Sequence, residues 1–215
     1  PAPLRAVLRA EAEWRLGSGD AEAAARAWAR SGLPLERVAL RLLRGKEPAA
    51  PTTLRVYLSI RLAALSAEAK VQRRLLAAWI VEVYLAELSH AHARTLASAT
   101  ATPTPTPTTS SSPSPPSSSS STTLSHLRGQ ERHLARDLVA FLKAQHRDLD
   151  SKTMIELVAA HGRTGILLEW CRITGDHDRV IAHHLQRKEW IAALRVIEGL
   201  DEAVAADLLY QHSPI

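Results

Sequence analysis

The sequence is poor in several residue types, and each shortage excludes a class of protein. Its single cysteine, Cys171, excludes a disulfide framework and any cysteine-based zinc module within the chain. Aromatic residues make up only 4%, which argues against a β-sandwich or barrel, because strands are rich in aromatic and β-branched residues. No apolar run reaches the ~20 residues that span a bilayer. The most apolar stretch, residues 75–88, is interrupted by Glu82 and Glu87.

The scarcity of cysteine also favours a reducing, cytosolic compartment. The sequence starts at Pro1 without an initiator methionine, and its first residues do not have the charged and apolar regions of a signal peptide. We therefore expect an internal piece of a longer, cytoplasmic protein.

Alanine, leucine and arginine, which are strong helix formers, dominate the composition. The apolar residues recur at spacings of three and four, the period of one helix face, and no strand-like alternation is present. Short breaks that contain Gly, Pro or Asp separate these stretches. The pattern predicts an all-α fold with helices at residues 4–16, 21–30, 35–46, 54–65, 69–97, 130–146, 151–161, 166–173, 178–186, 188–198 and 201–210.

A local pattern occurs twice, at residues 13–20 and 169–176. A Glu-Trp pair near the end of one predicted helix is followed after four residues by a Gly-Asp pair, which ends that helix and caps the next. Recurrent helical hairpins of this kind bury their apolar faces by stacking on their neighbours. The sequence therefore predicts an α-solenoid. We expect helix N-caps at Asp20, Asp150, Asp176 and at Thr52 or Thr53.

Residues 98–123 interrupt the helical pattern. They comprise only Ser, Thr, Pro and Ala, with no charged residue. Such a segment cannot bury enough apolar surface to offset the entropy of ordering, so we predict a disordered insertion. The predicted organisation is a first solenoid part at 1–97, a low-complexity linker at 98–123 and a second solenoid part at 124–215. Pairs such as Ser112-Pro113 are possible targets of proline-directed kinases.

The net charge of +5 suggests nucleic acid or a membrane surface as a partner. The excess is confined to residues 1–98, and acidic residues are interleaved with basic ones throughout, without a block of like charges. We interpret these charges as the solvated faces of helices. A helical-repeat nucleic-acid binder remains an alternative, and it requires a basic concave face.

The ten histidines were considered as metal ligands. His90 and His92 point to different sides of a helix and cannot chelate one ion, so we interpret them as surface residues near a helix end. His177 and His184 share a helix face, but two turns apart, at about 10 Å. No carboxylate lies one turn from either, as a metal site would need. A hydrolase that uses these histidines is the least favoured alternative.

No catalytic machinery is recognisable. Cys171 lies in an apolar helix, which is typical of a buried, inert thiol rather than a nucleophile. The sequence has no nucleophile elbow, phosphate-binding loop or dinucleotide-binding glycine motif. We therefore predict a protein that is not an enzyme, with no catalytic, cofactor-binding or metal-binding residue and no small-molecule substrate. Residues that bind partner proteins cannot be assigned.

The five tryptophans each lie on an apolar stripe, so packing between hairpins is the favoured interpretation and a partner surface the alternative. We expect the apolar faces around Trp79 with Tyr84, and around Trp170 with Trp190, to hold the stack together. The five are Trp14, Trp28, Trp79, Trp170 and Trp190.

Both flanks of the insertion resemble the middle region of the vacuolar protein sorting-associated protein 18 (Pep-three) family in the order and spacing of their segments. A further similar stretch lies at residues 36–43. The main segments are LRVYL at 54–58, LAAWIVEVYL at 76–85, IELVAAHG at 155–162, DRVIAHH at 178–184, WIAAL at 190–194 and YQHSPI at 210–215.

The resemblance implies a clathrin-heavy-chain-type α-solenoid from a core subunit of two endolysosomal tethering complexes, the homotypic fusion and vacuole protein sorting complex (HOPS) and its early-endosomal counterpart (CORVET). It implies that the partners are other core subunits and, through the complex, SNAREs and Rab-bearing membranes. It also implies a cytoplasmic location, peripheral on endosomes and lysosomes or vacuoles. Nucleic acid is not an expected partner. Another clathrin-type solenoid trafficking subunit remains possible, because a fold does not fix a function.

Overall fold

The computed structural model describes residues 2–100, 119–200, 205, 208 and 210, and all its regular secondary structure there is helical. This confirms the all-α solenoid. The described helices are α1 (Ala2–Gly17), α2 (Ala21–Arg30), α3 (Leu35–Arg44), α4 (Ala50–Ala63), α5 (Lys70–Thr100), α6 (Ser119–Gln145), α7 (Ser151–Ala160), α8 (Thr164–Thr174), α9 (His177–Gln186) and α10 (Trp190–Glu198). The chain divides into two compact units, Pro1–Leu138 and Val139–Ile215.

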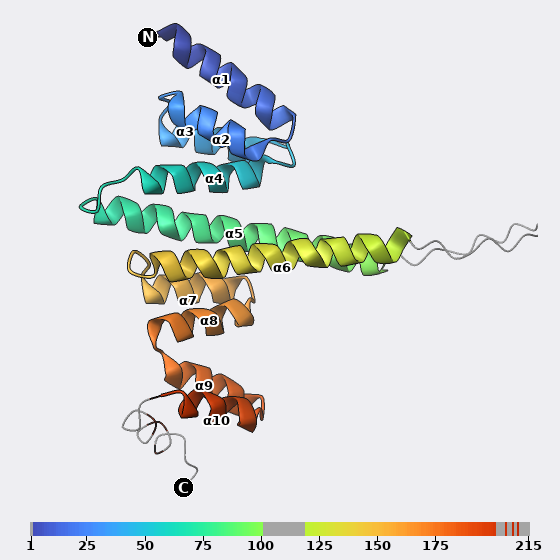
Figure 1. Cartoon of the computed structure of the whole chain (residues 1–215), viewed down its shortest axis with the longest axis vertical. Helices are drawn as coiled ribbons and strands as arrows, with labels where there is room; N and C mark the ends of the chain where they lie inside the picture. The colour runs from blue at the N-terminus through green and yellow to red at the C-terminus, as the bar shows by residue number, and fades with distance from the viewer. Residues whose placement is uncertain (1, 101–118, 201–204, 206–207, 209, 211–215) are drawn as a thin grey trace, which may run out of the picture. The chain divides into compact units, whose positions relative to one another are not determined.

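The first unit is built of successive helical hairpins (Figure 1). α2 packs against both α1 and α4, and α4 in turn packs against α3 and α5. On α1 the buried residues are Leu8, Ala12 and Leu16, which are four apart and form one stripe. On α5 the buried positions cover about two sides of the helix, as expected for a helix between neighbours.

In the second unit α8 packs against α7 and α9, and α9 packs against α10 (Figure 1). Leu142, Met154, Val158 and Cys171 are fully buried. A smaller apolar cluster joins Ile181 of α9 to Ala193 of α10 and to Leu208. Each unit therefore has apolar contacts of its own between sequence neighbours, as in other helical-repeat proteins.

The Gly-Asp turns form as predicted. Gly19 and Gly175 have φ of 83° and 75°, a left-handed conformation that glycine adopts without strain. The carboxylates of Asp20 and Asp176 accept hydrogen bonds from backbone N–H groups in the first turns of α2 and α9. Asp150 caps α7 in the same way.

The predicted cap of α4 at Thr52 or Thr53 is wrong. The helix begins four residues earlier than predicted, at Ala50, because Pro51 fits in the first helical turn, where its missing N–H is not needed. Thr53 lies inside the helix, and its hydroxyl donates to the carbonyl of Ala49.

The helices beside the Ser/Thr/Pro-rich insertion are longer than predicted. α5 continues to Thr100 and α6 begins at Ser119, so both enter the predicted linker at 98–123. Serine and threonine are tolerated inside helices, whereas proline is not, and the prolines of the insertion all lie within residues 103–116. The predicted disorder of 101–118, and most of the helix predicted at 201–210, lie outside the described residues. The three-part organisation stays a prediction.

Candidate functional site

The two histidines of α5 are exposed, as predicted, but α5 continues beyond them to Thr100, so they do not lie at a fraying end. Nδ1 of His92 lies 3.1 Å from a carboxylate oxygen of Glu131 on α6. This contact ties α6 to α5. His90 faces a groove that is described below.

The histidines of α9 are more buried than their sequence positions suggest. Nδ1 of His184 lies 2.9 Å from the carboxylate of Glu189, and this histidine is buried. Glu189 also accepts a hydrogen bond from Arg187. These contacts hold the pKa of Glu189 below its usual range. Glu189 lies five residues after His184, beyond the end of α9, so the spacing of one turn on a single helix does not reveal this contact.

Within residues 2–100 and 119–200, no three His, Cys, Asp or Glu side chains are grouped to hold a metal ion. Cys171 is buried on α8, and desolvation raises the pKa of its thiol. A thiol that is harder to ionise is a poorer nucleophile. The contact of His184 with Glu189 joins α9 to the turn between α9 and α10.

The tryptophans separate into buried and exposed groups. Trp28 and Trp170 are only 2% and 1% exposed, so both are core residues, as predicted. On α5, Trp79 is half-buried and Tyr84 is buried. The indole Nε1 of Trp170 is buried without a hydrogen-bond partner among the described residues, so apolar packing is what holds this side chain.

Trp14 and Trp190 correct the prediction that all five tryptophans pack in the core. They are 71% and 59% exposed. Trp14 lies on a different face of α1 from the stripe that contacts α2. Trp190 lies at the start of α10, where only Ala193 is buried and the outer face is apolar. The two copies of the pattern, at 13–20 and 169–176, therefore share the turn but differ in the burial of the tryptophan.

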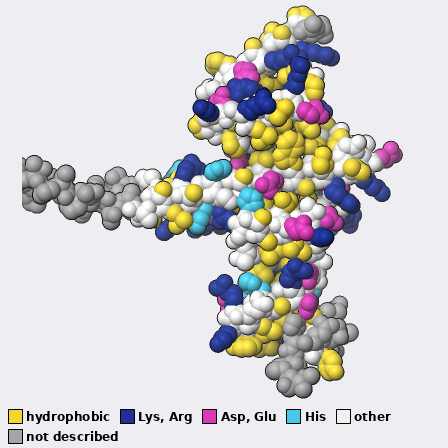
Figure 2. All heavy atoms as spheres, turned by 180° about the vertical axis from the view of Figure 1, so that it is seen from behind, with side chains coloured by type: hydrophobic (Ala, Val, Ile, Leu, Met, Phe, Trp, Pro, Cys, Tyr) yellow, Lys and Arg dark blue, Asp and Glu magenta, His cyan; other side chains and the backbone are white. Residues whose placement is uncertain are grey.

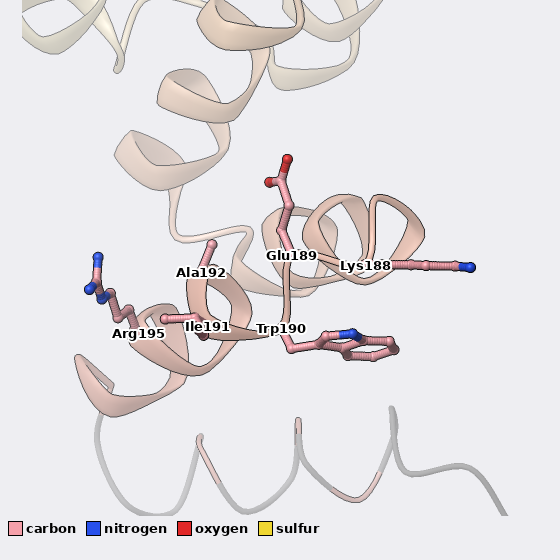
Figure 3. Close-up of a pocket in the computed structure, with 6 residues that line it drawn as sticks. All are labelled: Lys188, Glu189, Trp190, Ile191, Ala192 and Arg195. Atoms are coloured by element: carbon pink, nitrogen blue, oxygen red, sulfur yellow. The ribbon is translucent and has the colours of Figure 1, made fainter.

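Trp190 borders a shallow hollow at the surface of α10 (Figure 3). The side chains of Lys188 and Trp190 extend to one side, and the carboxylate of Glu189 points away from them. Ile191 is also exposed there. The hollow combines the aromatic ring of Trp190 with the cation of Arg195, two residue types enriched at protein interfaces, but it also contains Lys188 and Glu189, whose types are depleted there.

A buried polar cluster joins α4 to α5. Nε of Arg55 lies 2.8 Å from the carboxylate of Glu87, and the other carboxylate oxygen accepts a hydrogen bond from the hydroxyl of Thr52. The guanidinium also lies over the ring of Tyr84, 4.5 Å from its centroid, and donates to its hydroxyl. Burial alone would lower the pKa of Arg55, but Glu87 and Tyr84 more than offset it and raise that pKa overall.

A groove opens beside this cluster in the first unit. Its walls come from the loop between α3 and α4, the first turn of α4, one face of α5 and Leu134 of α6. Its floor is formed by the buried Leu42, Leu54 and Val83. The groove could not be predicted from the sequence, because its residues come from four separate segments and no local spacing indicates that they meet.

Many arginines of the first unit are held by acidic neighbours. Arg41 binds Glu13 at 2.8 Å and Glu47 at 2.9 Å, and Arg15 binds Glu11 at 2.8 Å. On the face shown in Figure 2, Lys and Arg side chains stand among Asp, Glu and hydrophobic groups. These pairs leave less free positive charge for a phosphate backbone than the formal charge of the chain indicates.

None of the helices in the described part of the chain has the length and apolar character needed to cross a bilayer. α5 is the longest of them, with 31 residues, and charged side chains recur along it.

Two similar proteins, from a plant and a fish, are both vacuolar sorting proteins of the same kind. A vacuolar sorting protein 18 from Arabidopsis thaliana is 22% identical over 182 residues, which cover 85% of this chain and 15% of the relative. A vacuolar protein sorting-associated protein 18 homolog from Danio rerio is 26% identical over 219 residues, covering all of this chain and 19% of the relative. The chain thus spans less than a fifth of the length of either relative.

The family model described as VPS18, alpha-solenoid domain, first half, matches residues 1–110. This match covers α1 to α5, including the hairpins that pack through α2 and α4. It includes more than half of the chain, and the helices found there are those of a solenoid. The chain therefore belongs to the VPS18 family.

Proposed function

We propose that this chain is a scaffold segment of a core subunit of the endolysosomal tethering complexes HOPS and CORVET, and that it supports membrane tethering and SNARE-mediated fusion. The observation that carries the proposal is the VPS18 solenoid match over residues 1–110. Stacked hairpins form a stiff support that sets the distance between binding modules, which is a common role of solenoids. Each Å² of apolar surface buried between hairpins contributes ~25 cal/mol of stabilising free energy, which keeps the hairpins packed against one another.

In this role the chain acts on no small molecule and carries out no reaction. Its partners are the other core subunits and, through the assembled complex, SNAREs and Rab-bearing membranes. The protein is cytoplasmic and peripheral on endosomes and on lysosomes or vacuoles.

Affinity purification of the tagged full-length protein from its own cells, followed by mass spectrometry, tests the proposal. We expect the other core tethering subunits to co-purify. A matched sample carries Trp170→Ala, which removes a core side chain of the second unit and should reduce the recovery of any partner that binds there. A Trp14→Ala sample, changed at an exposed site, controls for the loss of a tryptophan as such.

Recovery of RNA or of unrelated assemblies without tethering subunits contradicts the proposal. Association that falls steeply with salt would then favour a helical-repeat nucleic-acid binder. Recovery of a different coat or tethering complex would instead favour another clathrin-type trafficking subunit.

A further inference from the structure

We propose that the groove between α3, α4, α5 and α6 of the first unit is a docking site for an acidic, leucine-rich segment of a partner protein. The proposal rests on the scaffold function above and assigns to that scaffold one particular binding surface. Its basis is an apolar floor together with basic side chains that have no ion-pair or hydrogen-bond partner among the described residues.

The floor of the groove is apolar and already well packed. Leu42, Leu54 and Val83 are buried beneath it, whereas Leu43 stands 59% exposed on one wall. Leu134 of α6 contributes another apolar side chain, and Ala86 of α5 is small enough to leave the groove open. An apolar side chain from a partner would therefore cover Leu43 without displacing any core residue.

The acidic residues of the groove are already paired within the protein and are not available to a ligand. Its acidic residues, Glu47 and Glu87, are held at 2.9 Å by Arg41 and at 2.8 Å by Arg55. Internal partners thus neutralise both carboxylates before any ligand arrives. Glu87 is also buried, which makes it a poor partner for an incoming cation.

The basic residues of the groove have no such partners. Lys46, His90 and Arg94 are exposed, and none makes an ion pair or hydrogen bond with the described part of the chain. Lys46 lies on the loop between α3 and α4, whereas His90 and Arg94 lie on α5. A ligand that satisfies them must carry negative charge toward more than one wall of the groove.

The groove has the length of a short helical segment. Val83, Glu87, His90 and Arg94 are spaced at i, i+4, i+7 and i+11, so they line one face of α5 over roughly 16 Å. This equals about three helical turns, the usual reach of an amphipathic helix in a hydrophobic groove. The chain's own residues 101–118 do not fit, because they contain neither an acidic residue nor a leucine, isoleucine or aromatic residue.

The test uses the 215-residue chain and three fluorescein-labelled probe peptides of about 14 residues, a length suited to three turns of helix. The first has leucines at i, i+4 and i+7 with flanking glutamates. The second replaces the glutamates with lysines, and the third replaces the leucines with serines. Fluorescence anisotropy measures their binding, and a photo-reactive group on the peptide locates the contact by mass spectrometry.

We expect only the Glu/Leu peptide to bind, with cross-links at residues 42–54 and 83–94. The double variant Lys46→Glu/Arg94→Glu should weaken its binding at least about tenfold, because it reverses the charge of both walls. Leu43→Ala should weaken it about threefold or more through the lost apolar contact. Ala86→Trp should block the groove. Arg74→Glu on α5 and Leu40→Ala on α3 are matched controls, since both residues are exposed outside the groove, and should bind like the unaltered chain.

Absence of binding by the Glu/Leu peptide, equal binding of the lysine peptide, or cross-links on α10 would each overturn the proposal. So would binding to vesicles of phosphatidylserine and phosphatidylcholine that disappears in the double variant while no peptide binds, because the cations would then face a lipid surface. The test is independent of complex assembly. Normal recovery of tethering subunits by the double variant leaves the scaffold function intact, whereas peptide binding without that recovery would contradict the scaffold function alone.

Discussion

A residue's place on an apolar stripe did not determine whether it is buried. Trp14 and Trp170 each follow a glutamate and precede the same Gly-Asp turn, yet one is exposed and the other is part of the core. Burial depends on whether another helix covers that face, and this is a tertiary property. The local pattern could predict the turn, whose cause lies in Gly175 and Asp176 themselves, but not the packing partner.

Replacing Trp170 with alanine should lower the free energy of unfolding by about 3–5 kcal/mol, because it leaves a large cavity in a packed core. Trp170→Phe should cost less, since it keeps most of the volume and removes an indole N–H that has no partner among the described residues. Urea denaturation measures both. Trp190→Ala is the control and should change the stability by no more than about 0.5 kcal/mol. A loss in Trp170→Ala as small as that expected for the control would show that Trp170 is not a core residue.

Glu189 should make the stability of the folded protein depend on pH in the acidic range. Hydrogen bonds from His184 and Arg187 lower the pKa of Glu189 in the folded protein. A carboxylate of this kind stabilises the fold above its unfolded pKa of about 4.5, and the contribution is lost as the pH falls through the lowered folded value. Glu189→Gln should therefore destabilise the protein more at about pH 6 than at about pH 3, which lies below the unfolded pKa.

Urea midpoints at the two pH values test this difference. Glu198→Gln provides the control, because Glu198 is exposed and makes no ion pair with the described residues. A Glu189→Gln variant that stays equally destabilised at both pH values would mean that the charge of Glu189 is not the cause.

At the scale of the helix, the boundaries set by local turn and cap residues are the ones that the sequence predicted well. Glycines in left-handed turns and aspartate caps act locally, so α2, α7 and α9 begin where predicted to within one residue. The predicted start of α4 at residue 54 places Pro51 outside the helix, but proline is also a favourable residue in a first turn. The packing of α4 against α2 and α3 favours the longer helix. The groove likewise could not be predicted from local sequence patterns, because four separate segments form it.

The cap at Asp176 should be worth about 1 kcal/mol to the second unit. Its carboxylate accepts a hydrogen bond from the backbone N–H of Arg179. It also makes an ion pair with the guanidinium of Arg179 at 3.1 Å. Asp176→Ala removes both contacts, whereas Asp176→Asn keeps the cap and removes the charge. Thermal unfolding should rank the unaltered chain, Asn and Ala in decreasing stability. An asparagine variant as unstable as the alanine variant would assign the effect to the ion pair instead of the cap.

At the scale of the whole molecule, the two compact units should respond separately to core mutations. Helical-repeat proteins owe their stability to each repeat and to its contacts with the nearest neighbours. Trp170→Ala should therefore speed amide hydrogen exchange in α7, α8 and α9 and leave α2 and α4 protected. Trp28→Ala should do the reverse. Mass spectrometry of exchanged peptides measures both, and faster exchange throughout the chain in either variant would mean that the units unfold as one.

The pairing of α5 with α6 has a practical consequence. His92 and Glu131 hold the two helices together, and beyond this contact both extend in the same direction, to Thr100 and from Ser119 (Figure 1). A foreign domain encoded between these two residues would leave and re-enter the protein at neighbouring helix ends. The entropic cost of closing a loop grows only with the logarithm of its length. A fluorescent reporter or a proximity-labelling enzyme can therefore be inserted at this junction with little loss of stability.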